Sequence, residues 1–366
     1  MRIAIDVHSL GTQAGGNETY YRQLIRGLSA DPSKNSYTLF HTHPFALEAL
    51  KGDSRFSLCK VPKNPIVRLS LALPATLRQI RPDLFHCQYV QPVGGYRKTV
   101  VTIHDLAHEH FPQFFYPMEA FRMKKLVRWT AHRANHILTV SEFSAADIAE
   151  RFGLSRAKIT VAYQSPSPDF HPRDKQQCAA YLAQTYGIQE PFILYVGRIQ
   201  ARKNLPRLVE AYACLKKQGT AARLVIVGKK DWQSEQLLGR IRKLALEPFV
   251  TFPGFVPFDD LPLFYNAAEV FVFPSIFEGF GLPVMESMAS GVPTITSFGS
   301  SLQEVAGDGC LLIDPFDTNS IVSGLEKVLS DQDFRRDLID RGLRRAGQFG
   351  SDDLVKKTLA VYQSLV

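Results

Sequence analysis

Short runs of apolar and β-branched residues alternate along the chain with longer stretches in which apolar residues recur at helical spacing. The short runs predict buried strands and the longer stretches predict amphipathic helices, so their alternation indicates parallel sheets with crossover helices. The strands predicted in the first half are Ile3–Val7, Tyr37–Phe40, Leu84–His86, Thr99–Ile103 and Ile137–Val140, with a helix at Glu18–Leu28. Those predicted in the second half are Phe192–Val196, Arg223–Val227, Val250–Phe252, Val270–Phe273 and Pro293–Thr296. Because the pattern occurs twice, we predict the α/β class with two parallel-sheet domains.

A proline-rich segment divides the two patterns. Prolines cannot donate backbone hydrogen bonds to a strand ladder, so Gln164–Pro172 predicts a linker. We therefore predict an N-terminal domain over residues 1–168 and a C-terminal domain over residues 169–350. The length of 366 residues agrees with two domains, since one hydrophobic core rarely grows beyond about 250 to 300 residues. The last helical stretch follows a Gly-Ser break, and we expect residues 351–366 to pack back on the first domain.

Composition and charge narrow the classes of function. With 45% apolar and 21% charged residues, the chain has the balance of a globular protein. A formal net charge of +8 favours anionic partners such as nucleic acid, acidic lipid headgroups or phosphorylated small molecules. The five cysteines include no Cys-x-x-Cys pair, Met1–Asp6 enters directly into a strand, and no apolar run is long enough to span a bilayer. We therefore expect a cytoplasmic protein.

Two cations follow the first strand of the second pattern. Arg198 and Lys203 lie in the loop after this strand, and Asn204 is placed to cap the next helix. Amides at a helix N-terminus carry partial positive charge, so this loop is suited to a diphosphate at the carboxyl edge of a parallel sheet. Ordinary surface cations after a strand are the alternative interpretation.

Two glutamates stand in a second segment that joins a strand to a helix. Glu278 falls in the loop and Glu286 in the opening turns of the helix. Gly279 and Gly281 let backbone amides approach a ligand closely, because no Cβ stands in the way. Ionised carboxylates accept hydrogen bonds well from the vicinal hydroxyls of a sugar or a ribose. The alternative is that both carboxylates complement a helix dipole without any ligand.

The first domain holds two further candidate segments. Gly15 and Gly16 precede the first helix, where amides would face a phosphate, but the Gly-x-Gly-x-x-Gly fingerprint and the Walker A motif are both absent. His104, His108 and His110 follow a strand end. In a helix His104 and His108 would share a face and could bind a metal. We favour a loop in which His104 is a polar contact for a ligand.

Together these segments resemble the family 4 retaining glycosyltransferases of GT-B fold. The resemblance covers nearly the whole chain and rests on Gly15-Gly16, His104-Asp105-Leu106, Ser141-Glu-Phe-Ser144, Gly197-Arg198 with Lys203, and Glu278 and Glu286 seven residues apart. It implies two Rossmann-like domains that face each other across a cleft. It also implies transfer of a hexose, with retention, from a nucleotide diphosphate sugar of the UDP-glucose or GDP-mannose type to a glycan or lipid-linked saccharide acceptor.

The resemblance further implies roles for individual residues. Arg198 and Lys203 would hold the donor diphosphate and stabilise charge on the leaving group. Glu286 would bind the nucleotide ribose and Glu278 the hydroxyls of the donor hexose. His104 would contact the donor sugar near its reacting carbon, and with Arg198, Lys203 and Glu278 it completes the implied catalytic residues. The other implied donor contacts are Gly15, Gly16, Ser141, Ser144, Gly279, Phe280, Gly281 and Leu282, although Ser141 and Ser144 are equally suited to cap a helix that starts near Phe143. No cofactor or metal ion is expected, because protein cations take the place of a divalent ion.

Other interpretations stay open. The two glutamates could act as acid and base in a hydrolase or epimerase, or the site could bind a nucleotide sugar without catalysis. The basic helical stretch over residues 122–133 is typical of a solvated face, or of a helix that docks on acidic lipid headgroups to reach a lipid-linked acceptor. The second interpretation would place the protein peripherally at the inner face of the membrane. Nucleic acid is not expected as a partner.

Overall fold

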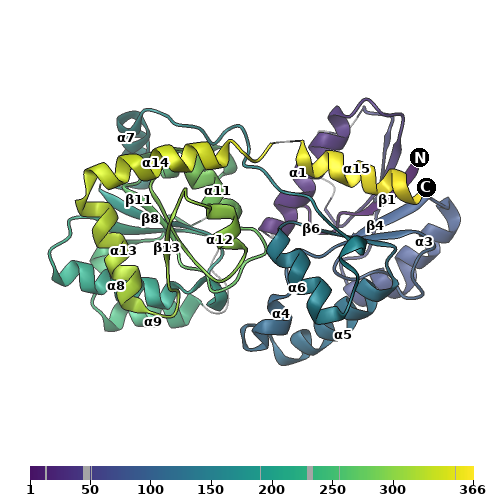
Figure 1. The fold of residues 1–366 in the computed structure, drawn as a ribbon, viewed down its shortest axis with the longest axis horizontal. Helices are drawn as coiled ribbons and strands as arrows, with labels where there is room; N and C mark the ends of the chain where they lie inside the picture. The colour runs from purple at the N-terminus through teal and green to yellow at the C-terminus, as the bar shows by residue number, and fades with distance from the viewer. Residues whose placement is uncertain are drawn as a thin grey trace. The chain divides into compact units, whose positions relative to one another are not determined.

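The computed structural model describes residues 1–12, 15–43, 50, 52–189, 191–228, 234–254, 256–350 and 352–366. Contacts between Cα atoms divide the chain into two compact units (Figure 1). Unit 1 consists of Met1–Gln164 and Asp352–Val366, and unit 2 of Ser165–Ser351. The division falls within the proline-rich segment, four residues before the sequence-based boundary at 168.

The described residues of unit 1 form a seven-stranded sheet in the order β3-β2-β1-β4-β5-β6-β7. Its strands are β1 (Arg2–Asp6), β2 (Ser36–His41), β3 (Phe56–Lys60), β4 (Leu84–Gln88), β5 (Thr99–Thr102), β6 (His136–Thr139) and β7 (Ile159–Val161). All neighbouring pairs are parallel. The predicted strands are present, and the sequence missed the two edge strands, β3 and β7.

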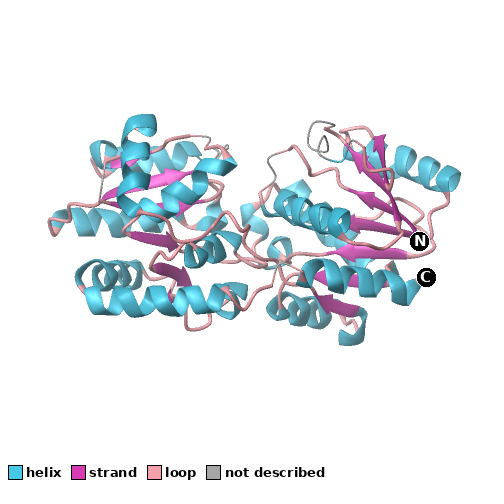
Figure 2. Ribbon diagram, turned by 90° about the horizontal axis from the view of Figure 1, so that it is seen from above, coloured by secondary structure: helices cyan, strands magenta, loops and turns pink. Residues whose placement is uncertain are grey.

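Helices cover both faces of this sheet, as Figure 2 shows. They are α1 (Gly16–Ala30), α2 (Pro65–Val67), the π-helix η2 (Arg68–Ala72), α3 (Leu73–Ile80), α4 (Ala107–His110), α5 (Pro117–Arg133), α6 (Glu142–Phe152) and the C-terminal α15 (Asp353–Leu365). α15 packs on α1 and on β7. Its Tyr362 is fully buried, and the phenol lies 2.5 Å from Nδ1 of His86 in β4. The last helix is therefore part of the core of unit 1.

The described residues of unit 2 form a six-stranded sheet in the order β10-β9-β8-β11-β12-β13. Its strands are β8 (Phe192–Val196), β9 (Arg223–Val227), β10 (Val250–Thr251), β11 (Val270–Phe273), β12 (Thr294–Ser297) and β13 (Leu311–Ile313). All neighbouring pairs are again parallel. The central strands β8 and β11 are buried along their whole length, which explains their continuous apolar runs.

The helices of unit 2 complete a second α/β domain. They are α7 (Lys175–Tyr186), α8 (Leu205–Lys217), α9 (Ser234–Lys243), α10 (Leu261–Ala267), α11 (Leu282–Ala289), α12 (Ser301–Ala306), α13 (Thr318–Ser330) and α14 (Gln332–Ala346). α8 packs on α13, and α11 packs on α14. Two parallel sheets with covering helices confirm the predicted α/β class. None of the described helices combines the length and the apolar character that a membrane span requires.

Candidate active site

The two candidate loops of unit 2 leave the same edge of its sheet. β8 and β11 are neighbouring parallel strands, so the loops after Val196 and Phe273 start side by side. The strand order also reverses here, because β9 and β10 lie on one side of β8 and β11 to β13 on the other. In open α/β sheets, ligands bind outside the carboxyl ends of the strands at such a switch point. Arg198, Lys203 and Glu278 therefore follow the strands that flank the ligand-binding position of this fold.

The loop after β8 is held close to the neighbouring loop after β9. The amide of Gly197 donates to the carbonyl of Val227 at 2.9 Å. A Cβ on Gly228 would lie only 1.9 Å from the carbonyl oxygen of Gly197, so this approach requires glycine. Arg198 follows directly and is partly exposed, and its buried Nε finds no hydrogen-bond partner among the described residues. A guanidinium in this state is suited to an anionic ligand.

Asn204 does not cap α8 in the way the sequence suggested. It occupies the N-cap position, but its backbone is left-handed, with φ 61°, and its side chain makes no capping hydrogen bond. Its amide instead donates to the carbonyl of Pro315 at 2.6 Å, and its Oδ1 accepts from Arg207 at 3.0 Å. Asn204 therefore ties the cation loop to the segment after β13.

Glu278 is the centre of a buried ion cluster. Oε1 accepts hydrogen bonds from Nζ of Lys203 and from Ser275, the latter at 2.5 Å, and Oε2 accepts from Arg202 at 2.9 Å. Burial alone would raise the pKa of this carboxyl, but the charges of Arg202 and Lys203 and the hydrogen bonds lower the pKa to about 2. Lys203 also lies over the ring of Phe273, 4.8 Å from its centroid. Two residues with separate predicted roles thus form one ion pair.

Arg202 belongs to this cluster, although the sequence analysis passed over it. Its Nη1 donates to the carbonyl of Phe277 at 3.1 Å as well as to Glu278. Its own carbonyl accepts from the amide of Ile276 at 2.8 Å and lies 3.1 Å from the hydroxyl oxygen of Ser275. The loops after β8 and β11 are therefore joined through both the backbone and the side chain of Arg202. Its position next to Lys203, in a loop already rich in cations, could have identified Arg202 as a site residue from the sequence.

Glu286 lies in the second turn of α11, and its surroundings shift the carboxyl pKa in the opposite direction to that of Glu278. Its Oε2 accepts a hydrogen bond from the phenol of Tyr265 at 2.8 Å. The side chain keeps some exposure to solvent. Desolvation of the carboxyl nevertheless raises the pKa of Glu286 to about 7, against a smaller lowering by the Tyr265 hydrogen bond. The two glutamates therefore titrate on opposite sides of the ordinary carboxyl range.

The segment between the two glutamates is tightly packed. Gly281 is the N-cap of α11 with φ 101°, and a Cβ there would meet Cδ2 of Leu302 at 2.4 Å. Phe280 is buried with its ring against that of Phe349, at 5.8 Å between centroids. The hydroxyl of Ser301 donates to the carbonyl of Glu278 at 2.7 Å. Gly279 and Leu282 are buried as well, so this predicted amide-lined segment is fixed before any ligand binds.

In unit 1, Gly15 and Gly16 form the start of α1. Gly15 is the N-cap with φ 63°, and its carbonyl accepts from the amides of Glu18 and Thr19. Gly16 is the first helical residue, and a Cβ added there would find no atom within 4 Å. Residues 13–14 of the predicted glycine loop lie outside the described residues. The carboxylate of Glu18 accepts from the amide of Gly11 at 3.2 Å, so this loop already contains one anion.

His104 follows β5 in a loop and is buried. The side-chain amide of Gln88 donates both to Nε2 of His104 at 2.9 Å and to the carbonyl of Asn17 at 3.2 Å. The carbonyl of Asn17 can only accept, so the amide nitrogen of Gln88 points at the imidazole, and Nε2 of His104 is an acceptor. Burial lowers the pKa of His104 to about 4, so the ring is neutral near pH 7. The contact also links His104 to the N-terminus of α1.

The hydroxyls of Ser141 and Ser144 form hydrogen bonds within unit 1. Ser141 is the N-cap of α6, and its hydroxyl accepts from the amide of Ser144 at 3.1 Å. The hydroxyl of Ser144 donates to the carbonyl of His104 at 2.9 Å. Ser141 therefore caps α6 as the alternative interpretation expected, and Ser144 holds the backbone of His104, a contact that the sequence did not indicate. The donor contact implied for both serines stays a prediction.

The three histidines of this segment do not converge. α4 begins at Ala107, so His104 precedes the helix and shares no helical face with His108. His110 lies 2.8 Å from a carboxylate oxygen of Asp147. Within the described ranges, no group of three or more His, Cys, Asp or Glu side chains has an arrangement suited to a metal ion.

Both units have a doubly wound, Rossmann-like sheet with a reversal of strand order, which is the architecture expected of a GT-B fold. Residues 14–165 match the family described as Glycosyltransferase Family 4, and residues 184–345 match Glycosyl transferases group 1. The O-antigen chain mannosyltransferase B of Escherichia coli is 32% identical over 292 residues, which cover 79% of this chain and 76% of that protein. The chain belongs to the family 4 glycosyltransferases.

A second mannosyltransferase and a solved glycosyltransferase structure are also similar to this chain. The serotype-specific mannosyltransferase WbdA of Escherichia coli is 32% identical over 266 residues, and the match covers 69% of this chain but only 32% of WbdA. Among solved structures, Alr3699/HepE of Anabaena in complex with UDP and glucose superimposes with a TM-score of 0.79 at 16% identity, covering 100% of both chains. At this identity the superposition shows a shared fold.

Proposed function

We propose that this glycosyltransferase is a retaining, metal-independent hexosyltransferase that uses a nucleotide diphosphate sugar of the UDP-glucose or GDP-mannose type. The observation that carries the proposal is the cluster at the switch point of unit 2, where Lys203 and Arg202 hold Glu278. Beside it, the buried Nε of Arg198 has no hydrogen-bond partner among the residues that the structure describes. The mannosyltransferase names of the relatives favour mannose as the hexose. The acceptor we propose is a glycan or lipid-linked saccharide.

The cations provide the means to stabilise the departing diphosphate. In the proposed reaction, Arg198 binds the diphosphate bidentately and Lys203 transfers one hydrogen bond from Glu278 to a phosphate oxygen. Glu278 then accepts from a hydroxyl of the hexose, while Arg202 and Ser275 keep the carboxylate in place. Preorganised cations of this kind stabilise charge that develops on the leaving group, so no metal ion is required for that step.

The remaining donor contacts are proposals carried by the family resemblance. Glu286 would accept from the nucleotide ribose, for which its carboxyl must be ionised. The amides of Gly279, Phe280, Gly281 and Leu282 would contact the sugar and phosphates. His104 would contact the donor hexose as a neutral ring, and Gly15 and Gly16 would contact the diphosphate. We propose a cytoplasmic reaction, in which the acceptor hydroxyl attacks the face that the diphosphate leaves.

The test begins with thermal unfolding in the presence of UDP-, GDP- and ADP-sugars, each with EDTA. We expect one nucleotide to raise the melting temperature selectively, and the matching sugar to be hydrolysed slowly without acceptor. Transfer to saccharide acceptors then follows, and NMR of the product gives the anomeric configuration. Binding without hydrolysis or transfer would indicate a noncatalytic sensor, an inverted linkage would exclude retention, and activity lost with EDTA would exclude metal independence.

A further inference from the structure

Helix α5 of unit 1 carries large apolar side chains that face solvent at its N-terminal end. Tyr116, Met118 and Phe121 are 54%, 68% and 60% exposed. The opposite side of the same helix is buried through Ala120, Val127, Thr130 and Ala131. α5 is therefore anchored in the core of unit 1 along one face, and its apolar outer residues are not explained by that core.

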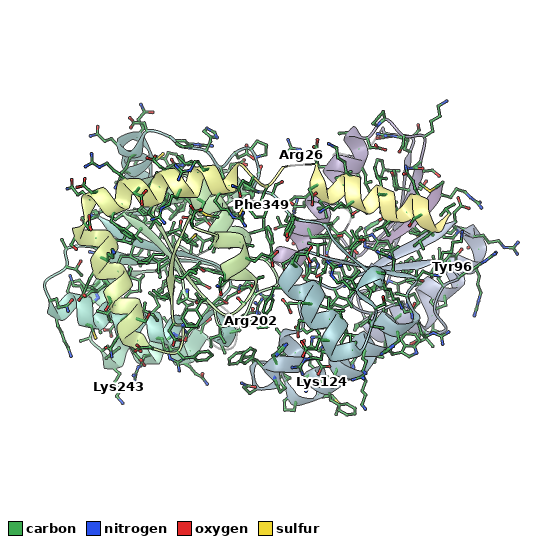
Figure 3. All side chains as sticks on the ribbon, viewed as in Figure 1. Arg26, Tyr96, Lys124, Arg202, Lys243 and Phe349 are labelled. Atoms are coloured by element: carbon green, nitrogen blue, oxygen red, sulfur yellow. The ribbon has the colours of Figure 1, made fainter. Side chains whose placement is uncertain are left out.

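The outer face of α5 is also strongly basic. Arg122, Lys125, Arg128 and Arg133 are exposed, and among the described residues none of the four forms an ion pair with a carboxylate. Lys125 and Arg133 instead lie over the rings of Phe121 and Trp129, at 6.0 and 5.6 Å from the centroids. The sequence has no Asp or Glu from residue 120 to residue 141. Lys124, labelled in Figure 3, pairs with Glu109 and lies nearer the buried side.

We propose that this surface, the α5 basic face of Met118, Phe121, Arg122, Lys125, Arg128 and Arg133, docks on a bilayer that contains anionic phospholipids. A helix with exposed apolar and basic side chains on one face binds in the plane of the interface, with the apolar groups in the acyl boundary and the cations among the headgroups. Long basic side chains beside aromatic rings suit that boundary, since their stems are apolar and their charges reach the headgroups.

The shape of this surface favours a bilayer over a nucleic acid. The 17 residues of α5 form a helix about 25 Å long, and the outer side of a helix is convex, whereas single-stranded nucleic acid is bound in a positively charged groove. We therefore commit to the bilayer and treat nucleic acid as an outcome of the test.

Docking through α5 would bring a membrane-bound acceptor to unit 1. α5 packs on α4, and α4 begins three residues after His104. The use of this surface in catalysis rests on the proposed lipid-linked acceptor, but membrane binding itself rests only on the residues of α5. Binding and transfer can therefore fail separately, which keeps the two proposals distinguishable.

The test is flotation of the full chain with phosphatidylcholine vesicles and with vesicles that contain about one third phosphatidylglycerol. The charge variant is Arg122→Gln with Lys125→Gln and Arg128→Gln, and the apolar variant is Met118→Ser with Phe121→Ser. The control removes three exposed cations of unit 2, through Lys217→Gln, Arg242→Gln and Lys243→Gln. It changes the net charge equally, and thermal unfolding verifies that every variant is folded.

We expect binding to the anionic vesicles only, at least a tenfold loss in the charge and apolar variants, and wild-type binding in the control. Equal binding to both vesicle types would overturn the proposal, as would an equal loss in the control. Competition by a short single-stranded RNA, with no effect of the apolar variant, would overturn it in favour of nucleic acid. Hydrolysis of the donor in solution should be unchanged in all variants, so loss of that activity is a separate result.

Discussion

The guanidinium of Arg202 lies 2.9 Å from Oε2 of Glu278, while Lys203 occupies Oε1 of the same carboxylate. Both oxygens are thus bound before any donor arrives. A donor that recruits Lys203 to its diphosphate has to remove one of the two cations from Glu278. Arg202 then becomes the residue that keeps the carboxylate ionised and in position, because it is tied to the same loop through Phe277 and Ile276.

Arg202→Met should therefore alter catalysis through Glu278. Without this guanidinium, the pKa of Glu278 rises from about 2 toward the ordinary carboxyl range, since burial opposes ionisation. We expect kcat to fall at least tenfold and the acidic limb of the pH profile to move to higher pH. Arg202→Lys should restore part of kcat because it keeps the charge. A fall in kcat without movement of the acidic limb would contradict this positioning role.

Lys203→Ala should remove stabilisation of the leaving group. Loss of one preorganised donor at a developing charge typically costs a factor of about 10² to 10³ in turnover. We expect a loss of this size in kcat/KM for the donor, with the fold kept because Arg202 and Ser275 still bind Glu278. Steady-state kinetics and thermal unfolding of the same preparation separate the two effects. Near-normal kinetics would exclude Lys203 from the site.

The strands that could be read from the sequence were the central ones. β8 and β11 are buried on both sides, so apolar residues follow one another and the pattern is unambiguous. The missed strands lie at or near the sheet edges. Phe56–Lys60 exposes Ser57, Leu58 and Lys60, so its buried and exposed positions do not alternate. Ile159–Val161 and the unpredicted edge strand of unit 2, Leu311–Ile313, are each three residues long, which is too short to show a pattern.

The candidate site was predictable in its residues but not in their pairing. A cation loop and a glutamate loop at strand ends were visible because such positions are surface-facing and chemically distinctive. Their ion pair depends on β8 and β11 being neighbours, which the sequence order does not state. The same holds for Gln88 and Ser144, which fix His104 from other elements of unit 1.

Gly16→Ala tests the proposed contact between Gly16 and the donor at a position where the fold itself tolerates a side chain. The added methyl group finds no atom within 4 Å, and alanine favours a helix over glycine by up to about 1 kcal/mol. Stability should therefore be kept or raised slightly, whereas donor affinity should fall at least tenfold if the amide approaches the diphosphate. Gly15→Ala should instead lower stability, because φ of 63° strains any residue with a Cβ. Unchanged donor affinity in Gly16→Ala would remove Gly16 from the donor site.

Glu286 should make stability and donor binding respond to pH in opposite directions. Its pKa of about 7 lies above the ordinary value of 4.5 because the carboxyl is desolvated. Ionisation of Glu286 is therefore less favourable in the folded than in the unfolded state. The free energy of unfolding is highest below about pH 4.5 and falls by on the order of 3 kcal/mol as the pH rises through 7. Donor affinity should rise over the same range, because the ionised carboxylate accepts from the ribose.

Glu286→Gln separates these effects because glutamine keeps an acceptor for Tyr265 but cannot ionise. We expect the variant to unfold at a higher temperature than the wild type at pH 8 and at a similar temperature at pH 4.5, with donor affinity that is low and independent of pH. Tyr265→Phe removes a hydrogen bond that lowers the pKa of Glu286. In this variant, the fall in stability and the rise in donor affinity should therefore both occur at higher pH than in the wild type. Identical stability curves for Glu286→Gln and the wild type between pH 5 and 8 would mean that Glu286 is ionised throughout, and the predicted pH dependence of donor binding would fail with it.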